Sequence, residues 1–513
     1  MKPLLQTGTQ HWPKSPGRER TPRTIRARTS PADKILLALT LIIAGGCFQD
    51  RVHAKADRPN LVFLLADQLR ASATGYGGDP NVRTPNLDRL AAASVNFRNA
   101  VSVCPVCTPY RAALMTGRFP TTTGMFLNDL YLPDEERCFA EILRDAGYTT
   151  GYIGKWHLDG HGRESFIPPE RRQGFEYWKA AECDHNYHHS HYYEGDSPEK
   201  RFWDGYDAFA QTRDAQQYIR EHARNGRPFA LFVSYGIPHF PHETAPDRFK
   251  ALYPPERIRF LPNVPPALQT DALRREAQGY YAHISALDEC VGDILRTLAE
   301  TGIEQDTILV FTSDHGEMLA SHGVPVTTKQ VPWDESARVP FLLRYPRAHA
   351  TGRVTTTPLT TPDILPTILR LAGLKIPKTV EGHDLSAVVR RGRELRDRAA
   401  LYMNVAPFAR PDLNRAYRAL RTARYTYVRA LDGPWLLFDD ARDPFQLNNL
   451  LGQPHAQPLV HQLDQHLRAE LKRIGDDFQP AAFYVEKFGY ELAPHGSISY
   501  APGAKVQSPK RAR

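Results

Sequence analysis

The chain has 513 residues, too many for one ordinary hydrophobic core and enough for one large domain with a smaller one. Hydrophobic residues make up 41% of the chain and charged residues 24%, which is the balance of a globular protein. The net charge of +8 comes mostly from residues 1–34, where eight Lys or Arg accompany two acidic residues, so the rest is nearly neutral and a nucleic-acid-binding surface is not expected.

An apolar run at residues 35–44 follows this basic segment. The run is too short to span a bilayer comfortably and is typical of the apolar core of a signal peptide. Small residues at Val52 and Ala54 predict cleavage after Ala54 and export to the periplasm or the extracellular space. A lipoprotein signal ending at Cys47 is one alternative, although the usual Leu three residues earlier is missing, and a basic tail on a cytosolic protein is another. No further membrane span is expected.

Short apolar runs alternate with amphipathic stretches in the next part of the chain. We predict strands at residues 60–66, 149–153, 229–235, 307–312 and 339–344, and helices at residues 85–95, 138–146 and 272–299. Strands that alternate with helices predict an α/β fold with a large mixed, mostly parallel sheet covered by helices on both faces.

Polar residues follow four of these predicted strands. They are Asp67 and Gln68, Lys155 and His157, His239, and Asp314 and His315. In sheets of this kind, ligands bind beyond the carboxyl ends of the strands. We therefore expect these side chains to meet in one site.

The pattern changes near residue 396. Antiparallel strands are predicted at residues 418–429 and 435–438, with a covering helix at residues 455–474. We therefore predict a basic lead with a signal peptide, a catalytic α/β domain, a small α+β subdomain and a loose tail, at residues 1–54, 55–395, 396–493 and 494–513.

The segment Cys107-Thr108-Pro109-Tyr110-Arg111 carries the most chemical information. Pro109 suits the first turn of a helix, which places Cys107 at a helix N-terminus, where backbone N–H groups favour an anion. A buried or lightly activated thiol in a loop is the alternative. Cys104 and Cys107 also form a C-x-x-C pair, but no second pair accompanies them, so a redox or zinc site is only weakly indicated.

These residues resemble the signature of the type I sulfatases, the formylglycine-dependent, arylsulfatase-like enzymes of the alkaline phosphatase superfamily. The resemblance continues in family order from about residue 59 to about residue 450. Its segments are Asp67-Gln68, Thr84 to Leu90, Thr116-Gly117-Arg118, Gly154 to His157, Pro238-His239, Asp314-His315-Gly316, Lys329, Arg338-Val339-Pro340, Asp443-Pro444 and Asn448 to Leu450. An ordered set of this length is far more specific than one short match.

The resemblance implies a sulfuric ester hydrolase whose Cys107 is oxidised to formylglycine by a dedicated maturation enzyme before the chain folds. One hydroxyl of the aldehyde hydrate then attacks sulfur and displaces the alcohol, and the second hydroxyl, once deprotonated, expels sulfate and regenerates the aldehyde. The implied roles are orientation of the hydrate for Arg111, charge neutralisation for Lys155 and Lys329, protonation of the leaving oxygen for His239, and positioning or deprotonation of the hydrate for His157. The implied substrate is a sulfated small molecule or, more specifically, a sulfated saccharide.

The resemblance also implies one divalent metal ion held by Asp67, Gln68, modified Cys107, Asp314 and His315. The oxygen ligands favour Ca²⁺, whereas the imidazole leaves Mn²⁺ or Mg²⁺ open. Many sulfatases carry Asp in place of Gln68 and Asn in place of His315, and the pair found here is more like the arylsulfatase and phosphonate monoester hydrolase branch. Hydrolysis of phosphonate monoesters or phosphodiesters is therefore one alternative, and a non-catalytic carbohydrate-binding relative is another.

The segment from Asp184 to Tyr193 is rich in His and Tyr. Its rings and imidazoles suit the lining of a substrate pocket, and an adventitious metal loop or a solvated surface loop are the alternatives.

Overall fold

The computed structural model describes residues 58–348, 352–408, 413–501 and 503–510. The predicted signal peptide, the cleavage after Ala54 and the alternative lipid attachment at Cys47 lie outside these residues. Within the described ranges, no helix has both the length and the apolar character needed to cross a membrane.

A sheet of ten strands forms the centre of the fold, in the order β11-β2-β10-β9-β1-β8-β4-β5-β6-β7. The five neighbours β9, β1, β8, β4 and β5 run parallel, whereas β10 and β6 are antiparallel to their neighbours. The predicted mixed, mostly parallel sheet is thus confirmed. The strands are β1 (Asn60–Asp67), β2 (Val95–Phe97), β4 (Thr149–Lys155), β5 (Tyr177–Ala181), β6 (His191–Glu194), β7 (Arg201–Phe202), β8 (Phe229–Pro238), β9 (Thr307–Ser313), β10 (Phe341–Arg344) and β11 (Arg353–Thr355).

Helices cover both faces of this sheet. Alternate residues of β1 enter different cores, since Leu61, Phe63 and Leu65 pack with one set of helices and Val62 and Leu64 with the other. A strand buried on both faces reads as a continuous apolar run, which is why β1 was predictable. The first set contains α3 (Cys107–Thr116), α5 (Phe139–Asp145) and α10 (Ile364–Leu371), and the second contains α2 (Pro85–Ala92), α6 (Asp207–His222) and α8 (Asp271–Glu300).

Shorter elements complete the large domain. They are the helices α4 (Pro120–Thr123), α7 (Asp247–Lys250), α9 (Asp334–Ala337) and α11 (Ser386–Arg391), and the paired strands β3 (Ala100–Val101) and β12 (Leu359–Thr360).

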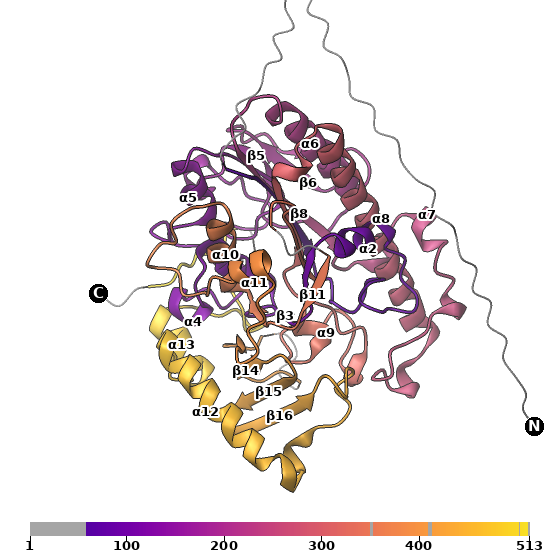
Figure 1. The fold of residues 1–513 in the computed structure, drawn as a ribbon, viewed down its shortest axis with the longest axis vertical. Helices are drawn as coiled ribbons and strands as arrows, with labels where there is room; N and C mark the ends of the chain where they lie inside the picture. The colour runs from indigo at the N-terminus through magenta and orange to yellow at the C-terminus, as the bar shows by residue number, and fades with distance from the viewer. Residues whose placement is uncertain (1–57, 349–351, 409–412, 502, 511–513) are drawn as a thin grey trace, which may run out of the picture. The chain divides into compact units, whose positions relative to one another are not determined.

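A second, antiparallel sheet of four strands follows, and Figure 1 shows the long helix α12 (Gln457–Ile474) alongside it. The single strand predicted at residues 418–429 is wrong, because two strands occupy this range. The Thr422 hydroxyl accepts hydrogen bonds from the backbone N–H groups of Arg424 and Tyr425 and closes a turn between them. The strands are β13 (Ala400–Asn404), β14 (Tyr417–Arg421), β15 (Tyr425–Ala430) and β16 (Gly433–Asp439).

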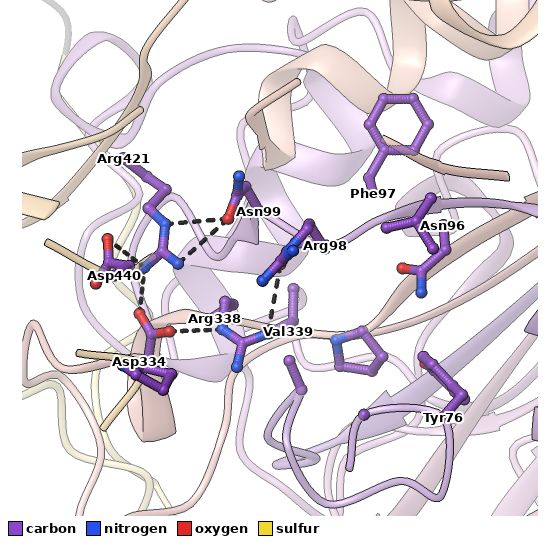
Figure 2. A pocket seen from close by; sticks show the side chains of 15 residues that line it. Tyr76, Asn96, Phe97, Arg98, Asn99, Asp334, Arg338, Val339, Arg421 and Asp440 are labelled. Carbon is purple, nitrogen blue, oxygen red and sulfur yellow. Dashed lines mark hydrogen bonds and ion pairs between the residues drawn. The ribbon is translucent and has the colours of Figure 1, made fainter. Parts of the chain in front are cut away.

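A hollow of about 380 Å³ lies where the two sheets meet, and none of the predicted site residues line it (Figure 2). Its charged groups largely satisfy one another. The Arg421 guanidinium binds Asn99, Asp334 and Asp440, and Arg338 donates to the same Asp334 carboxylate. We interpret this hollow as a junction that ties the small sheet to the large one, since removing one partner would leave a buried charge uncompensated.

The C-terminal residues return to the large domain after α13 (Ala481–Phe488). The backbone N–H of Tyr131 donates to the Gln507 carbonyl over 3.0 Å, and the Tyr490 hydroxyl donates to the Gly124 carbonyl over 2.7 Å. The limits of the predicted domains stay predictions.

Candidate active site

Four neighbouring parallel strands end at the same edge of the large sheet. Asp314 and His315 follow β9, and Asp67 ends the neighbouring strand β1. His239 follows β8, and Lys155 ends β4, the next strand in the sheet. The register pairs Ala66 with Ser313 and Asp67 with Pro238, so the polar residues lie side by side. The structure thereby brings together the side chains that follow the predicted strands.

Helix α3 carries Cys107 into this group. The helix begins at Cys107, with Pro109 in its first turn as predicted, and all of its residues are buried. A side chain from another loop holds its start, because Asn128 Oδ1 accepts the Thr108 N–H over 3.1 Å. The Cys107 thiol thus points from a helix N-terminus into the cluster at the sheet edge, where His315 Nε2 lies 3.3 Å from Sγ.

Positive groups surround the Cys107 thiol. Lys329 Nζ lies 3.5 Å and Lys155 Nζ 3.7 Å from Sγ. Burial and the Asp67 carboxylate oppose ionisation, but Lys155, Lys329 and His315 outweigh them and hold the pKa of Cys107 well below its usual value. Cys104 is also a free thiol, and burial raises its pKa to about 12, so only one member of the C-x-x-C pair lies in an activating environment.

Asp67, Cys107, Asp314 and His315 form a donor set that fits a metal ion. One ligand atom from each lies within 4.8 Å of all the others, and all four residues are buried. His315 Nδ1 lies 3.1 Å from the Gly316 carbonyl, so the neutral ring would keep its proton on Nδ1 and offer Nε2, which faces Cys107 Sγ, to a metal ion.

The two buried carboxylates of this set, Asp67 and Asp314, repel each other when both are ionised. Burial and the Asp67 charge raise the pKa of Asp314 to about 6, since two neighbouring carboxylates resist ionising together. A divalent ion between them would remove this repulsion.

Gln68 lies at the rim of this set, with its amide held in one orientation. Its NH₂ group donates to Glu317, and its Oε1 accepts from Lys329 Nζ over 3.2 Å. The Gln68 backbone N–H donates to Asp314 Oδ1 over 3.0 Å. Its role as a metal ligand stays a prediction. Glu317 was missed in the sequence, although its place two residues after His315 was the available signal.

Arg111 and Lys155 bind the carboxylates, and Lys155 also contacts the thiol. Lys155 Nζ lies 2.7 Å from Asp67 Oδ2, and Arg111 Nη2 lies 3.2 Å from Asp67 Oδ2 and 3.4 Å from Asp314 Oδ2. Burial alone would raise the pKa of Asp67, but the charges of Lys155 and Arg111 hold it well below its usual value. Arg111 therefore fixes the two carboxylates, and its predicted orientation of the hydrate stays a prediction.

His157 is paired with an acid that the sequence did not reveal. Its Nε2 lies 3.0 Å from Asp129 Oδ1. Burial opposes protonation of the ring, but Cys183 and Asp129 raise the pKa of His157 to about 9. Asp129 also accepts two hydrogen bonds from Arg163. No periodic pattern marks Asp129, which lies in a loop.

His239 faces Lys329 across 3.0 Å, measured from Nε2 to Nζ. Its Nδ1 lies 2.8 Å from the Phe240 carbonyl and therefore carries a proton, so Nε2 accepts from Lys329. Burial and the Lys329 charge hold the pKa of His239 well below its usual value. The ring is thus neutral before substrate binds.

Comparison with known families now decides the class of enzyme. The sequence profile described as sulfatase matches residues 59–374, which is more than half of the chain. This chain belongs to the sulfatase family. The profile described as the C-terminal part of N-sulphoglucosamine sulphohydrolase matches residues 325–473. The family predicted from the motifs is confirmed, and the enzyme hydrolyses sulfate esters.

Individual relatives agree with this assignment. The sulfatase is 50% identical over 459 residues to an ulvan-active sulfatase of Formosa agariphila, covering 88% of this chain and 89% of the relative. It is 30% identical over 523 residues to an endo-4-O-sulfatase of Bacteroides thetaiotaomicron, covering 89% and 99%. A phosphonate monoester hydrolase of Agrobacterium radiobacter matches with a TM-score of 0.65 over 86% of this chain and 99% of its own, but at 22% identity this shows the fold alone.

Proposed function

We propose that this sulfatase hydrolyses sulfate monoesters of saccharides with a formylglycine made from Cys107. The observation that carries the proposal is the position of Cys107, at the start of α3 between two lysines and the Asp67, Asp314 and His315 donors. Relatives support the substrate class, since an N-acetylgalactosamine-6-sulfatase of mouse is 29% identical over 418 residues, covering 73% of each chain.

We propose that one divalent metal ion is held by Asp67, Asp314, His315 and the modified residue 107. The carboxylate oxygens favour Ca²⁺, and Mn²⁺ or Mg²⁺ are the alternatives that the imidazole leaves open. When both are present, the formylglycine hydrate supplies a nucleophilic hydroxyl and the ion polarises the bound sulfate.

The protein's own side chains then perform the remaining work. Lys155 and Lys329 stabilise the charge that develops on the sulfate oxygens in a buried site, where such interactions are strong. His157, held by Asp129, positions the hydrate. His239 and Lys329 share a hydrogen bond, so the proton for the leaving oxygen comes from this pair.

The role of His239 can be tested by changing the leaving group. A sugar alkoxide needs a proton to leave, whereas an activated aryl oxide does not. We expect His239→Ala to lower kcat/KM by about 10²-fold or more on a sugar sulfate, in the range of general acid catalysis, and clearly less on the aryl sulfate. The measurement is the loss of kcat/KM on the sugar sulfate divided by the loss of kcat/KM on the aryl sulfate.

Lys155→Ala is the matched control for His239→Ala. Lys155 contacts Asp67 and Cys107 but not His239, so its loss should harm both substrates alike. Lys329→Ala should also lower turnover of both, with an added loss on the sugar sulfate because Lys329 donates to His239. Equal losses for His239→Ala on the two substrates would remove His239 from the acid role.

We also propose that the enzyme is exported. The basic segment at residues 1–34 and the apolar run at residues 35–44 support this proposal. We expect the mature protein to begin after Ala54 and to be recovered outside the cytoplasm, which N-terminal sequencing of fractionated cells would check. A protein that keeps residues 1–54 and stays in the cytosol would contradict it.

A further inference from the structure

A hollow of about 650 Å³ lies beside the active site, within the range of roughly 300–1,000 Å³ typical of ligand sites. Three separate parts of the chain line it. They are residues 161–165, the His-rich segment that begins after Glu182, and the C-terminal residues around Tyr500.

Two routes of direct contact connect this hollow to the reacting atoms. His185 lines the hollow, and its ring stacks on that of His239 with 4.1 Å between centroids. On the other route, Arg163 lines the hollow and binds Asp129, which holds His157. The hollow therefore lies behind His185 and Arg163, on the side of the active site that carries His239 and His157.

The walls of the hollow offer polar atoms that make no hydrogen bond within the described part of the chain. His191 is only 4% exposed, its Nδ1 donates to Asp184, and its Nε2 has no hydrogen-bond partner among the described residues. An unpaired buried nitrogen of this kind costs free energy unless a ligand binds it. Arg163 donates from Nε and Nη2 to Asp129, and its Nη1 makes no hydrogen bond to the described residues.

In the part of the chain that the structure describes, the wall of the hollow contains one cation with a free donor, Arg163, beside the acidic groups Glu164 and Asp184 and the Cys183 thiol. The acidic members of the lining are occupied, since Glu164 pairs with Lys200 and Asp184 with His191. Asp129 accepts hydrogen bonds from Arg163 Nε and Nη2 and lies 3.0 Å from His157 Nε2, so this carboxylate is also occupied.

Tyr500 adds an aromatic wall. The Arg163 guanidinium lies 3.8 Å from the centroid of its ring, and the Tyr500 side chain is 46% exposed. An aromatic ring with one face occupied by a cation keeps the other for an apolar face of a ligand. The C-terminal segment thereby contributes directly to the hollow.

We propose that this hollow binds the saccharide unit next to the sulfated sugar, and that this unit carries an anionic group, either a carboxylate or a second sulfate. The inference rests on the proposed function. Arg163 Nη1 would donate to the anionic group, since planar guanidinium groups suit oxyanions, and His191 Nε2 would accept a hydrogen bond from a sugar hydroxyl.

The test uses matched substrates with the full-length enzyme. A small aryl sulfate is compared with three sulfated disaccharides. In the first the neighbouring unit is a uronic acid, in the second this unit is reduced to its neutral alcohol, and in the third it carries a second sulfate. We expect the wild-type KM to be at least about tenfold lower for the preferred acidic disaccharide than for the neutral one, as for one hydrogen bond to a charged group. The carboxylate and sulfate arms identify which anion the hollow prefers.

Variants locate this preference in the hollow. Arg163→Gln should make KM for the acidic disaccharide equal to KM for the neutral one. Because both substrates are measured on the same variant, any effect that Arg163 has on kcat through Asp129 cancels in this comparison. His191→Phe should raise KM for saccharides more than for the aryl sulfate. The control is His189→Phe, since His189 lies in the same segment but stacks on Phe202 outside the lining and should leave the ratio unchanged.

Each outcome has one interpretation. Hydrolysis of the disaccharides with equal KM for acidic and neutral forms, or an unchanged ratio in Arg163→Gln, would overturn the inference and leave the proposed function standing. A third outcome would overturn both the inference and the proposed function. In this outcome the enzyme turns over the aryl sulfate but hydrolyses no sulfated saccharide, and the unsulfated acidic disaccharide does not inhibit it.

Discussion

Replacing Cys107 with alanine is expected to lower kcat/KM by roughly 10⁴-fold or more while the protein still folds. The substitution removes one sulfur atom from a side chain at the start of α3 and leaves the helix residues unchanged. Because the proposed nucleophile is made from this side chain, no other group in the cluster can replace it. The measurement is kcat/KM on an aryl sulfate, with circular dichroism to check the fold.

Cys104 provides the matched control for this loss. It is a free, buried thiol three residues earlier, and it packs in the hydrophobic core rather than in the polar cluster. We expect Cys104→Ala to retain activity near that of the wild type. Substantial turnover by Cys107→Ala, or equal loss in both variants, would show that the reaction does not depend on residue 107.

Removing the metal ion is expected to abolish turnover, and Asp314→Ala should lose both bound metal and activity, by about 10³-fold or more. The physical reason is that burial and the neighbouring Asp67 carboxylate raise the pKa of Asp314 when no metal ion is bound. A bound ion relieves this repulsion, so added metal should raise the Tm of the wild-type apoprotein but not that of Asp314→Ala. Elemental analysis and thermal unfolding measure the two effects.

Asp432→Ala is the control for Asp314→Ala, since Asp432 is an exposed carboxylate that lies 3.9 Å from Arg415. It should bind metal and hydrolyse substrate as the wild type does. An active preparation of the enzyme without any metal by elemental analysis would contradict the proposed site, and the identity of the ion that restores activity would decide between Ca²⁺, Mn²⁺ and Mg²⁺.

The central sheet and the meeting of the site residues could be predicted because both depend on local patterns. Continuous apolar runs such as residues 60–66 mark strands buried on both faces, and a polar residue after each run marks the edge where ligands bind. Pro109 similarly fixed the start of α3 at Cys107.

Partners chosen by tertiary packing could not be predicted. Asp129 and Glu317 lie outside any periodic pattern, and only the folded chain shows that they hold His157 and Gln68. The neutral state of His239 likewise follows from burial beside Lys329, which no sequence pattern encodes. The position of Tyr500 against Arg163 depends on the path of the C-terminal segment back to the large domain.

Mass spectrometry of the tryptic peptide from Asn99 to Arg111 tests the central claim most directly. This peptide contains both Cys104 and Cys107, so the first serves as an internal reference for the second. We expect an aldehyde or its hydrate at residue 107, an unmodified thiol at residue 104, and a specific activity proportional to the modified fraction. Full activity from protein that carries only the unmodified thiol at Cys107 would contradict the account.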